Sequence, residues 1–245
     1  MEVDEQKSPV IKTVGLVKRF NDYAVLNGVS MEVLPGETMA IVGVSGCGKS
    51  TLLRHIIGSI WADEGHVELF GRDIYQMTDR QLDELRMRLG ILFQSGALFS
   101  SMTVGQNVAL PLREHTELDD DTIEVMIRIK LELVGLREAV DLMPAEISGG
   151  MKKRAGLARA IALDPDILFY DEPTSGLDPV TAAEINQLIT DLAGKTGVTS
   201  VVVTHDMDSA FRIADRMAML DKGRILKVAP VAQFQAIRDS SAAAS

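Results

Sequence analysis

Residues 38–51 read TMAIVGVSGCGKST, an apolar run followed by a segment with three glycines, a lysine and three hydroxyl residues. Gly43, Gly48, Lys49 and Ser50 satisfy the spacing G-x-x-x-x-G-K-[ST], in which a buried strand leads into a loop and then into a helix. The glycines let the loop turn tightly, so that successive backbone N–H groups point at phosphate oxygens, and the start of the helix adds positive charge. The stretch therefore predicts a strand, a phosphate-binding loop and a helix.

The side chains of this loop indicate a nucleoside triphosphate bound with a divalent cation. Lys49 would neutralise the β and γ phosphates, and the hydroxyl of Ser50 would hold Mg²⁺. The alternative is a glycine-rich turn that only begins a helix, and the apolar strand before the loop counts against it. The residues that we expect around the phosphates are Gly43, Ser45, Gly46, Cys47, Gly48, Lys49, Ser50 and Thr51.

A second motif, DILFYDEPT at 166–174, places Asp171 and Glu172 directly after an apolar run. Folds of the α/β class present their ligand sites at this end of a strand. We expect Asp171 to act on Mg²⁺ through water and Glu172 to polarise the attacking water as general base. Alone, such an acidic pair is more often the cap of the next helix. Together with the phosphate loop, it favours the catalytic interpretation.

Short apolar runs alternate with helical patterns, which is typical of an α/β fold with a mainly parallel sheet. Runs of half-buried character before residue 70 predict an N-terminal antiparallel β-subdomain beside the main sheet. The expected buried strands are TMAIVG (38–43), GILF (90–93), DILFYD (166–171) and TSVVVTH (199–205).

The chain is expected to form one domain over residues 1–245, with a helical subdomain at 95–153 inserted within the core. The helical pattern that begins at Val180 is expected to stop at Gly194, since glycine is common just after a helix. Residues 239–245 read as a frayed polar tail.

Composition limits the compartment and the partners. With 35 acidic and 25 basic residues, the chain has a formal net charge of -10. This charge disfavours broad attachment to nucleic acid or anionic lipid, although it leaves local phosphate sites open. The single cysteine, Cys47, permits no internal disulfide, and the N-terminal MEVDEQKSP lacks the pattern of a signal peptide. We therefore expect a cytoplasmic protein that does not bind nucleic acid.

The longest uncharged stretch, LGILFQSGALFSSMTVGQNVALPL, runs from 89 to 112 between Arg88 and Arg113. A membrane-spanning helix needs about 20 mostly apolar residues, and this stretch is long enough. It nevertheless contains two glutamines, an asparagine, a proline, three serines and three glycines. We reject a membrane span, so the stretch either fills a core or meets a partner.

A phosphate loop alone also fits a GTPase or a small-molecule kinase. The guanine-specific N-K-x-D pattern is absent from the sequence. Two further motifs help to separate the remaining classes: EISGGMKKR (146–154) precedes the acidic strand, and TSVVVTHD (199–206) places His205 at the end of a later strand.

Six motifs in order, GVSGCGKST, Gln94 after ILF, ISGG, ILFYDEP, SGLD and VVVTHD, resemble the nucleotide-binding subunits of ABC transporters. The resemblance covers almost the whole chain and implies a P-loop NTPase core. It also implies two identical ATPase subunits that sandwich two ATP molecules with Mg²⁺. Each site would join the phosphate loop of one subunit to the SGG turn of the other.

The resemblance also assigns further residues. Ser148, Gly149 and Gly150 lead into a helix, so their N–H groups would form a second anion-binding surface. Gln94 would sense Mg²⁺ and the water, and His205 would touch the γ-phosphate. Asp178 would contact the partner subunit.

Adenine is stacked in this family by an aromatic residue near the end of the first strand. Phe20 fits that position best by spacing, and Tyr23 is the alternative.

The segment LFQSGALFSSMTVGQNVALPLREHT, together with Met151 after the SGG turn, resembles the ATPase of bacterial Mla or MCE-type lipid transporters. This implies membrane permease subunits, an MCE-domain lipid carrier, phospholipid as cargo and a place on the cytoplasmic face of the inner membrane. A small STAS-domain subunit is a further partner of some members. In the ABC family, the segment that matches 95–112 forms part of a groove for a helix of the permease, and few charges suit such a surface.

The alternative is a soluble ABC-type ATPase that acts on DNA or ribosomes. Such proteins usually carry a long coiled-coil insertion, a Cys-x-x-Cys hook or two ATPase domains. The sequence has none of these features.

Overall fold

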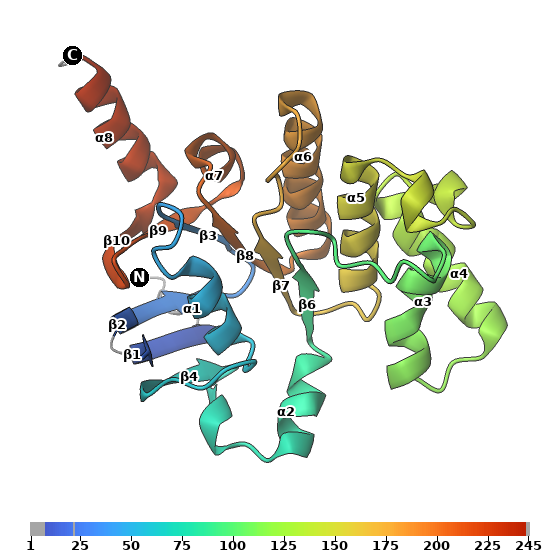
Figure 1. Ribbon diagram of the computed structural model, residues 1–245, viewed down its shortest axis with the longest axis horizontal. Coiled ribbons are helices and arrows are strands. Elements are labelled where there is room, and N and C mark those ends of the chain that lie inside the picture. Colours follow the sequence, from blue (N-terminus) through green and yellow to red (C-terminus); the bar gives the residue numbers. More distant parts are fainter. Residues whose placement is uncertain (1–7, 22, 244–245) are drawn as a thin grey trace, which may run out of the picture.

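A six-stranded sheet forms the centre of the computed structural model, in the order β10-β9-β3-β8-β7-β6 (Figure 1). The structure describes residues 8–21 and 23–243. Neighbouring strands of this sheet are parallel except for β10, which pairs antiparallel with β9. The mainly parallel sheet is thus confirmed. Its strands are β3 (Thr38–Val42), β6 (Leu89–Leu92), β7 (Ile167–Asp171), β8 (Thr199–Thr204), β9 (Arg216–Asp221) and β10 (Arg224–Pro230).

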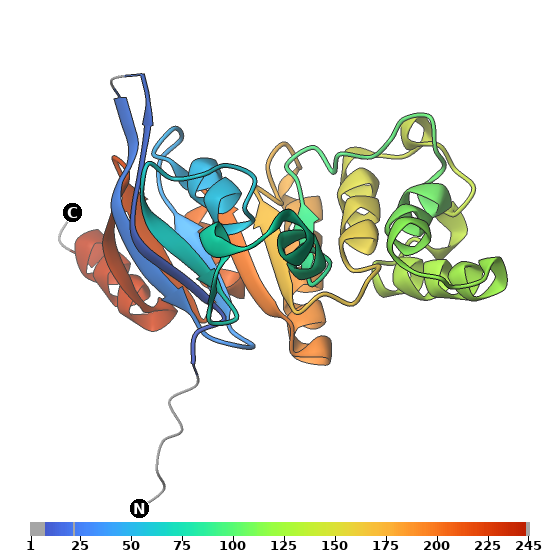
Figure 2. The same cartoon turned by 90° about the horizontal axis from the view of Figure 1, so that it is seen from below.

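The N-terminal antiparallel sheet is also confirmed, in the order β2-β1-β4-β5. Its first two strands form a long hairpin that extends beyond the rest of the sheet (Figure 2). Its strands are β1 (Ile11–Phe20), β2 (Tyr23–Val33), β4 (Glu64–Leu69) and β5 (Arg72–Asp73).

Helix α1 (Lys49–Ile56) joins the two sheets into one core. Its buried face, which includes Leu52 and Ile56, packs in a cluster with Val67 of the antiparallel sheet and Phe169 of the main sheet. Because α1 begins at the phosphate loop, this double contact fixes the loop relative to both sheets.

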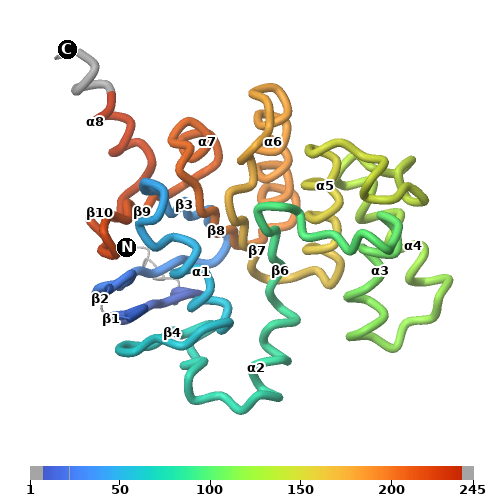
Figure 3. Tube along the Cα trace, viewed as in Figure 1, coloured from blue at the N-terminus to red at the C-terminus, as the bar shows by residue number. Residues whose placement is uncertain are grey.

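The remaining helices pack against the main sheet or form a separate group. Helices α3, α4 and α5 lie together to one side (Figures 1 and 2), in the stretch where the sequence predicts a helical insertion. The Cα trace leaves the main sheet after β6, passes through this group and returns at β7 (Figure 3). The α-helices are α2 (Asp79–Arg86), α3 (Val104–His115), α4 (Asp120–Leu133), α5 (Gly149–Ala160), α6 (Pro179–Thr196), α7 (Met207–Ile213) and α8 (Val231–Ala243), and short 3₁₀ turns lie at Ile74–Gln76, Arg137–Ala139 and Pro144–Glu146.

The uncharged stretch 89–112 forms β6, a connecting loop and most of α3. Its residues Leu92, Val104, Val108 and Leu112 are buried in the core of the helical group. Throughout residues 8–21 and 23–243, no helix combines the length and the apolar character that crossing a membrane requires. The stretch therefore fills part of a core, while Phe93 and Phe99 within it remain exposed.

Two predicted element ends differ from the structure. Helix α6 continues past Gly194 to Thr196, and Gly197 with φ 68° is its C-cap. Both glycines suit a helix end by composition, but it is Gly197 that adopts the left-handed conformation. Residues 239–243, expected as frayed tail, belong to α8, and 244–245 lie outside the described residues. The alanines at 242 and 243 are strong helix formers, which favours continuation.

The hairpin of β9 and β10 was not predicted. Lys222 and Gly223 both have positive φ, 44° and 73°, which suits the two-residue turn of a hairpin. The signal in the sequence was DKG between two apolar runs, 216–221 and 224–230. Without it, the main sheet would lack its antiparallel edge.

The end of α6 can be tested with one substitution at two positions. Gly194→Ala should stabilise the protein by about 0.5–1 kcal/mol, because Gly194 is inside the helix and an added Cβ meets nothing within 4 Å. Gly197→Ala should destabilise it by roughly 1 kcal/mol, because the left-handed conformation disfavours alanine. Chemical denaturation of both variants measures the difference. The opposite order would place the helix end at Gly194.

Candidate functional site

The parallel pairing of three strands determines where the site lies. Val42 of β3 pairs with Thr204 of β8, and Asp171 of β7 pairs with Val203 of β8. The carboxyl ends of the three strands therefore meet at one edge of the sheet, where α/β folds bind ligands. The phosphate loop, the acidic pair and His205 follow directly after these strand ends.

The phosphate loop depends on glycine at its two ends. A Cβ on Gly43 would lie 2.2 Å from the carbonyl oxygen of Leu220, and a Cβ on Gly48 would lie 2.8 Å from that of Val25. Gly48 also has φ 111° and is the N-cap of α1. The backbone can approach its neighbours this closely only without side chains. Cys47 is buried and contributes its main chain to the loop.

Lys49 lies across the loop with its side chain almost fully buried. Its Nζ donates to the carbonyl oxygens of Gly43 (2.8 Å) and Val44 (3.2 Å) and lies 3.8 Å from Oε1 of Glu172. Ser50 donates from Oγ to Oδ1 of Asp171 at 3.2 Å. The structure thus brings Lys49 close to Glu172, and it brings together Ser50 and Asp171, the two residues predicted to hold Mg²⁺.

Burial raises the pKa of Asp171, while the hydrogen bond from Ser50 lowers it and the nearby Glu172 raises it again. Burial and the neighbouring Glu172 therefore disfavour the charged form of the Asp171 carboxyl group. A cation at Ser50 and Asp171 would relieve this repulsion, since an adjacent positive charge stabilises a carboxylate.

Glu172 has an unusual main-chain conformation for a residue other than glycine, with φ 49°. Such conformations cost about 1–3 kcal/mol and concentrate at functional sites. Its Oε2 lies 2.8 Å from Nδ1 of His205 and 3.4 Å from both the main-chain nitrogen of His205 and Oγ1 of Thr204. The carboxylate is held at the end of β8 and can accept a proton from a water molecule there. Thr204 was not predicted, although it directly precedes His205 in the same motif.

A cavity of about 260 Å³ opens between these elements. Gln94 lines it from the loop after β6 and donates from Nε2 to Oγ of Ser175 at 3.2 Å. Val25 of β2 also lines it and was not predicted, because no motif marks an aliphatic residue of a hairpin. The lining residues are Val25, Ser45, Gly46, Gly48, Lys49, Ser50, Thr51, Gln94, Glu172 and His205.

These residues fit a triphosphate with Mg²⁺. Among the residues that the structure describes, no three His, Cys, Asp or Glu side chains gather into a metal site. A divalent ion beside Ser50 and Asp171 would therefore complete its shell with phosphate oxygens and water, as Mg²⁺ does in nucleotide sites. Once bound, it would neutralise the charge that develops on the phosphates.

The SGG turn lies outside this cavity. Ser148 is the N-cap of α5 and accepts a hydrogen bond from the main-chain nitrogen of Met151 at 3.2 Å. A Cβ on Gly150 would lie 2.5 Å from Cγ2 of Thr181. Asp178 caps α6 and accepts from the hydroxyl of Thr181 at 2.6 Å, which is the main reason that its pKa is lowered. The SGG turn and Asp178 are thus neighbours on a surface separate from the cavity.

Neither aromatic candidate for adenine lines the cavity. Phe20 and Tyr23 pair with each other across the β1–β2 hairpin, and both rings are largely exposed. The Lys18 ammonium lies 5.7 Å from the centre of the Phe20 ring. Val25, two residues after Tyr23, is the part of the hairpin that reaches the cavity.

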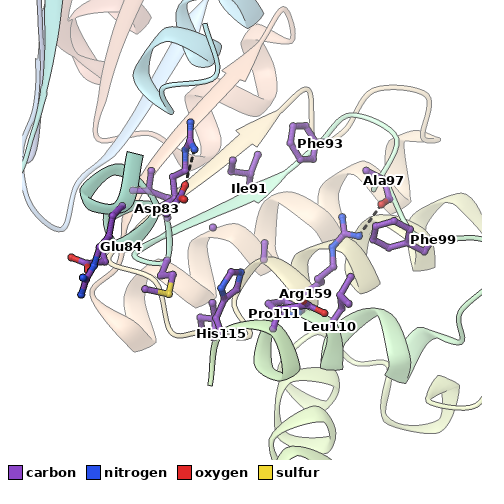
Figure 4. A pocket seen from close by; sticks show the side chains of 18 residues that line it. Asp83, Glu84, Ile91, Phe93, Ala97, Phe99, Leu110, Pro111, His115 and Arg159 are labelled. Carbon is purple, nitrogen blue, oxygen red and sulfur yellow. Dashed lines mark hydrogen bonds and ion pairs between the residues drawn. The ribbon is translucent and has the colours of Figure 1, made fainter. Parts of the chain in front are cut away.

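A second, larger concavity of about 1120 Å³ lies between α2, β6, α3 and α5. Figure 4 shows Ile91, Phe93, Phe99, Leu110 and Pro111 around it, and all of these belong to the uncharged stretch. We call it the apolar groove. Leu98 is packed against the core of the helical group and is not among the residues that line this groove.

Charged residues of both signs surround the apolar groove, among them Asp83, Glu84 and Arg80. Arg159 of α5 donates to the carbonyl oxygens of Ala97 (2.8 Å) and Gly96 (3.2 Å), and its guanidinium lies 6.0 Å from the centre of the Phe99 ring. Arg159 therefore links the apolar groove to the loop that carries Gln94.

A strand, a glycine loop with Lys49 and an acidic pair at one sheet edge define a P-loop ATPase. The family model described as "ABC transporter" matches residues 26–175. The chain belongs to the ABC transporter family, as an ATP-hydrolysing subunit that uses Mg²⁺.

Individual relatives agree with this assignment. The chain is 45% identical over 206 residues to the "intermembrane phospholipid transport system ATP-binding protein MlaF" of Haemophilus influenzae, covering 84% of this chain and 78% of that protein. It is 42% identical over 220 residues to the "probable ribonucleotide transport ATP-binding protein mkl" of Mycobacterium leprae, covering 90% of this chain and 63% of that protein.

A solved structure shows the same fold around products of ATP hydrolysis. The dimeric ATP-binding cassette MJ0796, bound to ADP and Pi, superposes with a TM-score of 0.82 at 29% identity and covers 90% of this chain and 98% of that one. Fold class and nucleotide chemistry are therefore as the sequence predicts.

Glu172→Gln tests the general base. The amide keeps the shape of the side chain but cannot accept a proton, so turnover should fall by about 10²–10⁴-fold while ATP still binds. Phosphate release measures turnover, and equilibrium titration with ATP measures binding. Turnover at the level of the unaltered protein would remove Glu172 from this role.

Lys49→Ala tests the phosphate contact. A charge-assisted hydrogen bond to phosphate would be lost, which should weaken ATP binding by about 2 kcal/mol. Calorimetric titration of ATP gives the affinity, and thermal unfolding without nucleotide serves as the folding control. Normal affinity in a folded variant would contradict the placement of Lys49.

Proposed function

We propose that the chain powers a membrane transporter of phospholipid, as one of two identical subunits that sandwich two ATP molecules. The assignment of phospholipid as cargo rests on 45% identity, over 84% of the chain, to a phospholipid transport ATP-binding protein. The apolar groove supports a membrane partner, because it offers a continuous apolar surface beside the ATP site.

The site residues receive roles consistent with their contacts. Glu172 acts as general base, and His205, 2.8 Å away, orients its carboxylate and reaches the γ-phosphate. Lys49 neutralises the β and γ phosphates, and Ser50 and Asp171 hold Mg²⁺. Gln94 responds to the metal and the attacking water from the loop beside the groove.

The second ATP-binding surface is the SGG turn, residues 148–150, with Asp178 next to it. Its N–H groups at the start of α5 suit an anion. Since this surface lies away from the cavity of its own chain, it would bind the nucleotide held by the other copy. The dimeric state of the similar structure MJ0796 supports this arrangement. The adenine would stack on Phe20 or on Tyr23 at the hairpin.

The apolar groove would receive a short amphipathic helix from a permease subunit. Phe93, Phe99, Leu110 and Pro111 would contact its apolar face, and the charges around the groove would pair with its polar residues. ATP binding and release would move this groove through the loop of Gln94. The inserted helical subdomain, which we assign to 95–153, contributes much of this surface. Its assigned end falls inside α5, which continues to Ala160.

The proposed assembly contains two copies of this chain, permease subunits and an MCE-domain lipid carrier, with a STAS-domain subunit as a further candidate. The chain would lie on the cytoplasmic face of the bacterial inner membrane as a peripheral subunit. A net charge of -10 argues against the alternative of an ATPase that acts on DNA or ribosomes.

The groove predicts a separation of two activities. Phe99→Asp should abolish copurification with the permease, because docking would strand a charge in an apolar contact. Phe99 is 50% exposed, so the isolated subunit should stay folded. Val125→Asp is the matched control, since Val125 of α4 is 56% exposed and does not line the groove.

The same complexes test the cargo. Proteoliposomes that contain the assembly should transfer labelled phospholipid in an ATP-dependent way, and the Phe99→Asp chain should not support transfer. Uptake of a ribonucleotide without lipid transfer would show that the cargo is a ribonucleotide and not phospholipid. Recovery of ribosomes or DNA without a permease would favour the soluble alternative.

A further inference from the structure

Lys153 of α5 is a buried cation that none of the motif assignments uses. Its side chain is only 4% exposed, and its Nζ donates to the main-chain oxygen of Glu172 at 3.0 Å. Burial lowers the pKa of Lys153, and the nearby Glu172 and Asp171 act in the opposite direction. Burying an ammonium group is costly unless it gains specific contacts. The contact that it gains is with the backbone of the proposed general base.

Glu172 is held from several sides in its left-handed conformation. Its main-chain nitrogen donates to the oxygen of Val203 at 2.8 Å, and its own oxygen accepts from the main-chain nitrogen of Ser175 at 3.2 Å. Those bonds come from β8 and from the loop after Glu172. Lys153 adds a contact from the helix that begins at the SGG turn.

Helix α5 is well suited to transmit a displacement. Lys153 is three residues after Gly150, within the first turns of a continuous helix. Farther along, a Cβ on Gly156 would lie 2.8 Å from the oxygen of Gly96, and a Cβ on Gly96 would lie 2.8 Å from the oxygen of Lys152. The helix and the loop after Gln94 therefore pack backbone against backbone, with little freedom to slide.

We infer that Lys153 is a positioning residue that sets the main chain of Glu172 according to the position of α5. Since the SGG turn would bind the nucleotide of the second copy, Lys153 would connect that nucleotide to the general base of its own chain. This inference deepens the proposed function and rests on it. The ammonium acts through Glu172 and does not touch the nucleotide.

A purely structural role for Lys153 makes a different prediction. The oxygen of Glu172 already accepts a bond from Ser175, so loss of the Lys153 bond leaves no buried acceptor without a partner. Replacing a buried charge with an apolar side chain of similar length is often neutral for stability or stabilising. Stability and turnover should therefore respond differently.

The test compares Lys153→Met, Lys153→Arg and Lys152→Met in the full chain. Lys153→Met should lower kcat by about 10- to 100-fold, since small misplacement of a catalytic group has effects of that size. The KM for ATP should stay within about 3-fold, because the residues that contact phosphate are unchanged. Lys153→Arg keeps a charged donor and should recover most of the turnover.

Lys152→Met is the control for charge removal on the same helix. The Lys152 side chain makes no hydrogen bond within the described part of the chain, so this variant should keep its kcat. Thermal unfolding of all three variants reports stability. An unchanged kcat in Lys153→Met would overturn the inference. So would a joint loss of stability, kcat and ATP affinity that Lys153→Arg does not restore.

Failure of the proposed function has a separate signature. If Glu172→Gln remains a strict monomer with ATP, alone and with its membrane partners, the two-copy sandwich is wrong. If it dimerises but Lys153→Met turns over normally, only the role of Lys153 is wrong.

Discussion

The parallel ladder of β3, β8 and β7 is the constraint on which the rest of the molecule depends. Its register aligns Val42 with Thr204 and Asp171 with Val203, so three loops leave the sheet at the same height. A slip of one residue would turn each side chain to the opposite face of the sheet. The distance of 3.8 Å between Lys49 and Glu172 is a direct result of this register.

Helix α5 gives the site its connection to the rest of the protein. One end is the SGG turn, the middle contacts Glu172 through Lys153, and the far end contributes Arg159 to the apolar groove. The proposed ATP-binding turn and the apolar groove are thus joined by one continuous helix. Motion at either end must be accommodated by the other, or by the loop of Gln94 between them.

Sequence predicts the parts of this protein that local chemistry specifies. The phosphate loop, the acidic pair and the mainly parallel sheet follow from spacing and from apolar runs that must be buried on both faces. Gly194 and Gly197 show the limit, since either glycine can end a helix and the sequence does not indicate which of them adopts the left-handed conformation. The contact of Lys153 with Glu172 joins residues 19 positions apart and could not be predicted, because no local pattern marks it. The position of Val25 at the cavity could not be predicted for the same reason.

The facing glycines of α5 and the loop, Gly156 and Gly96, leave no side-chain atoms of their own between the two segments. Because no flexible side chain separates the two backbones, the contact between them is rigid. A single methyl group at either position would act as a wedge. The close packing of α5 against the loop thus depends on two glycines. A substitution at either one would separate the two segments, although neither residue lines the ATP cavity.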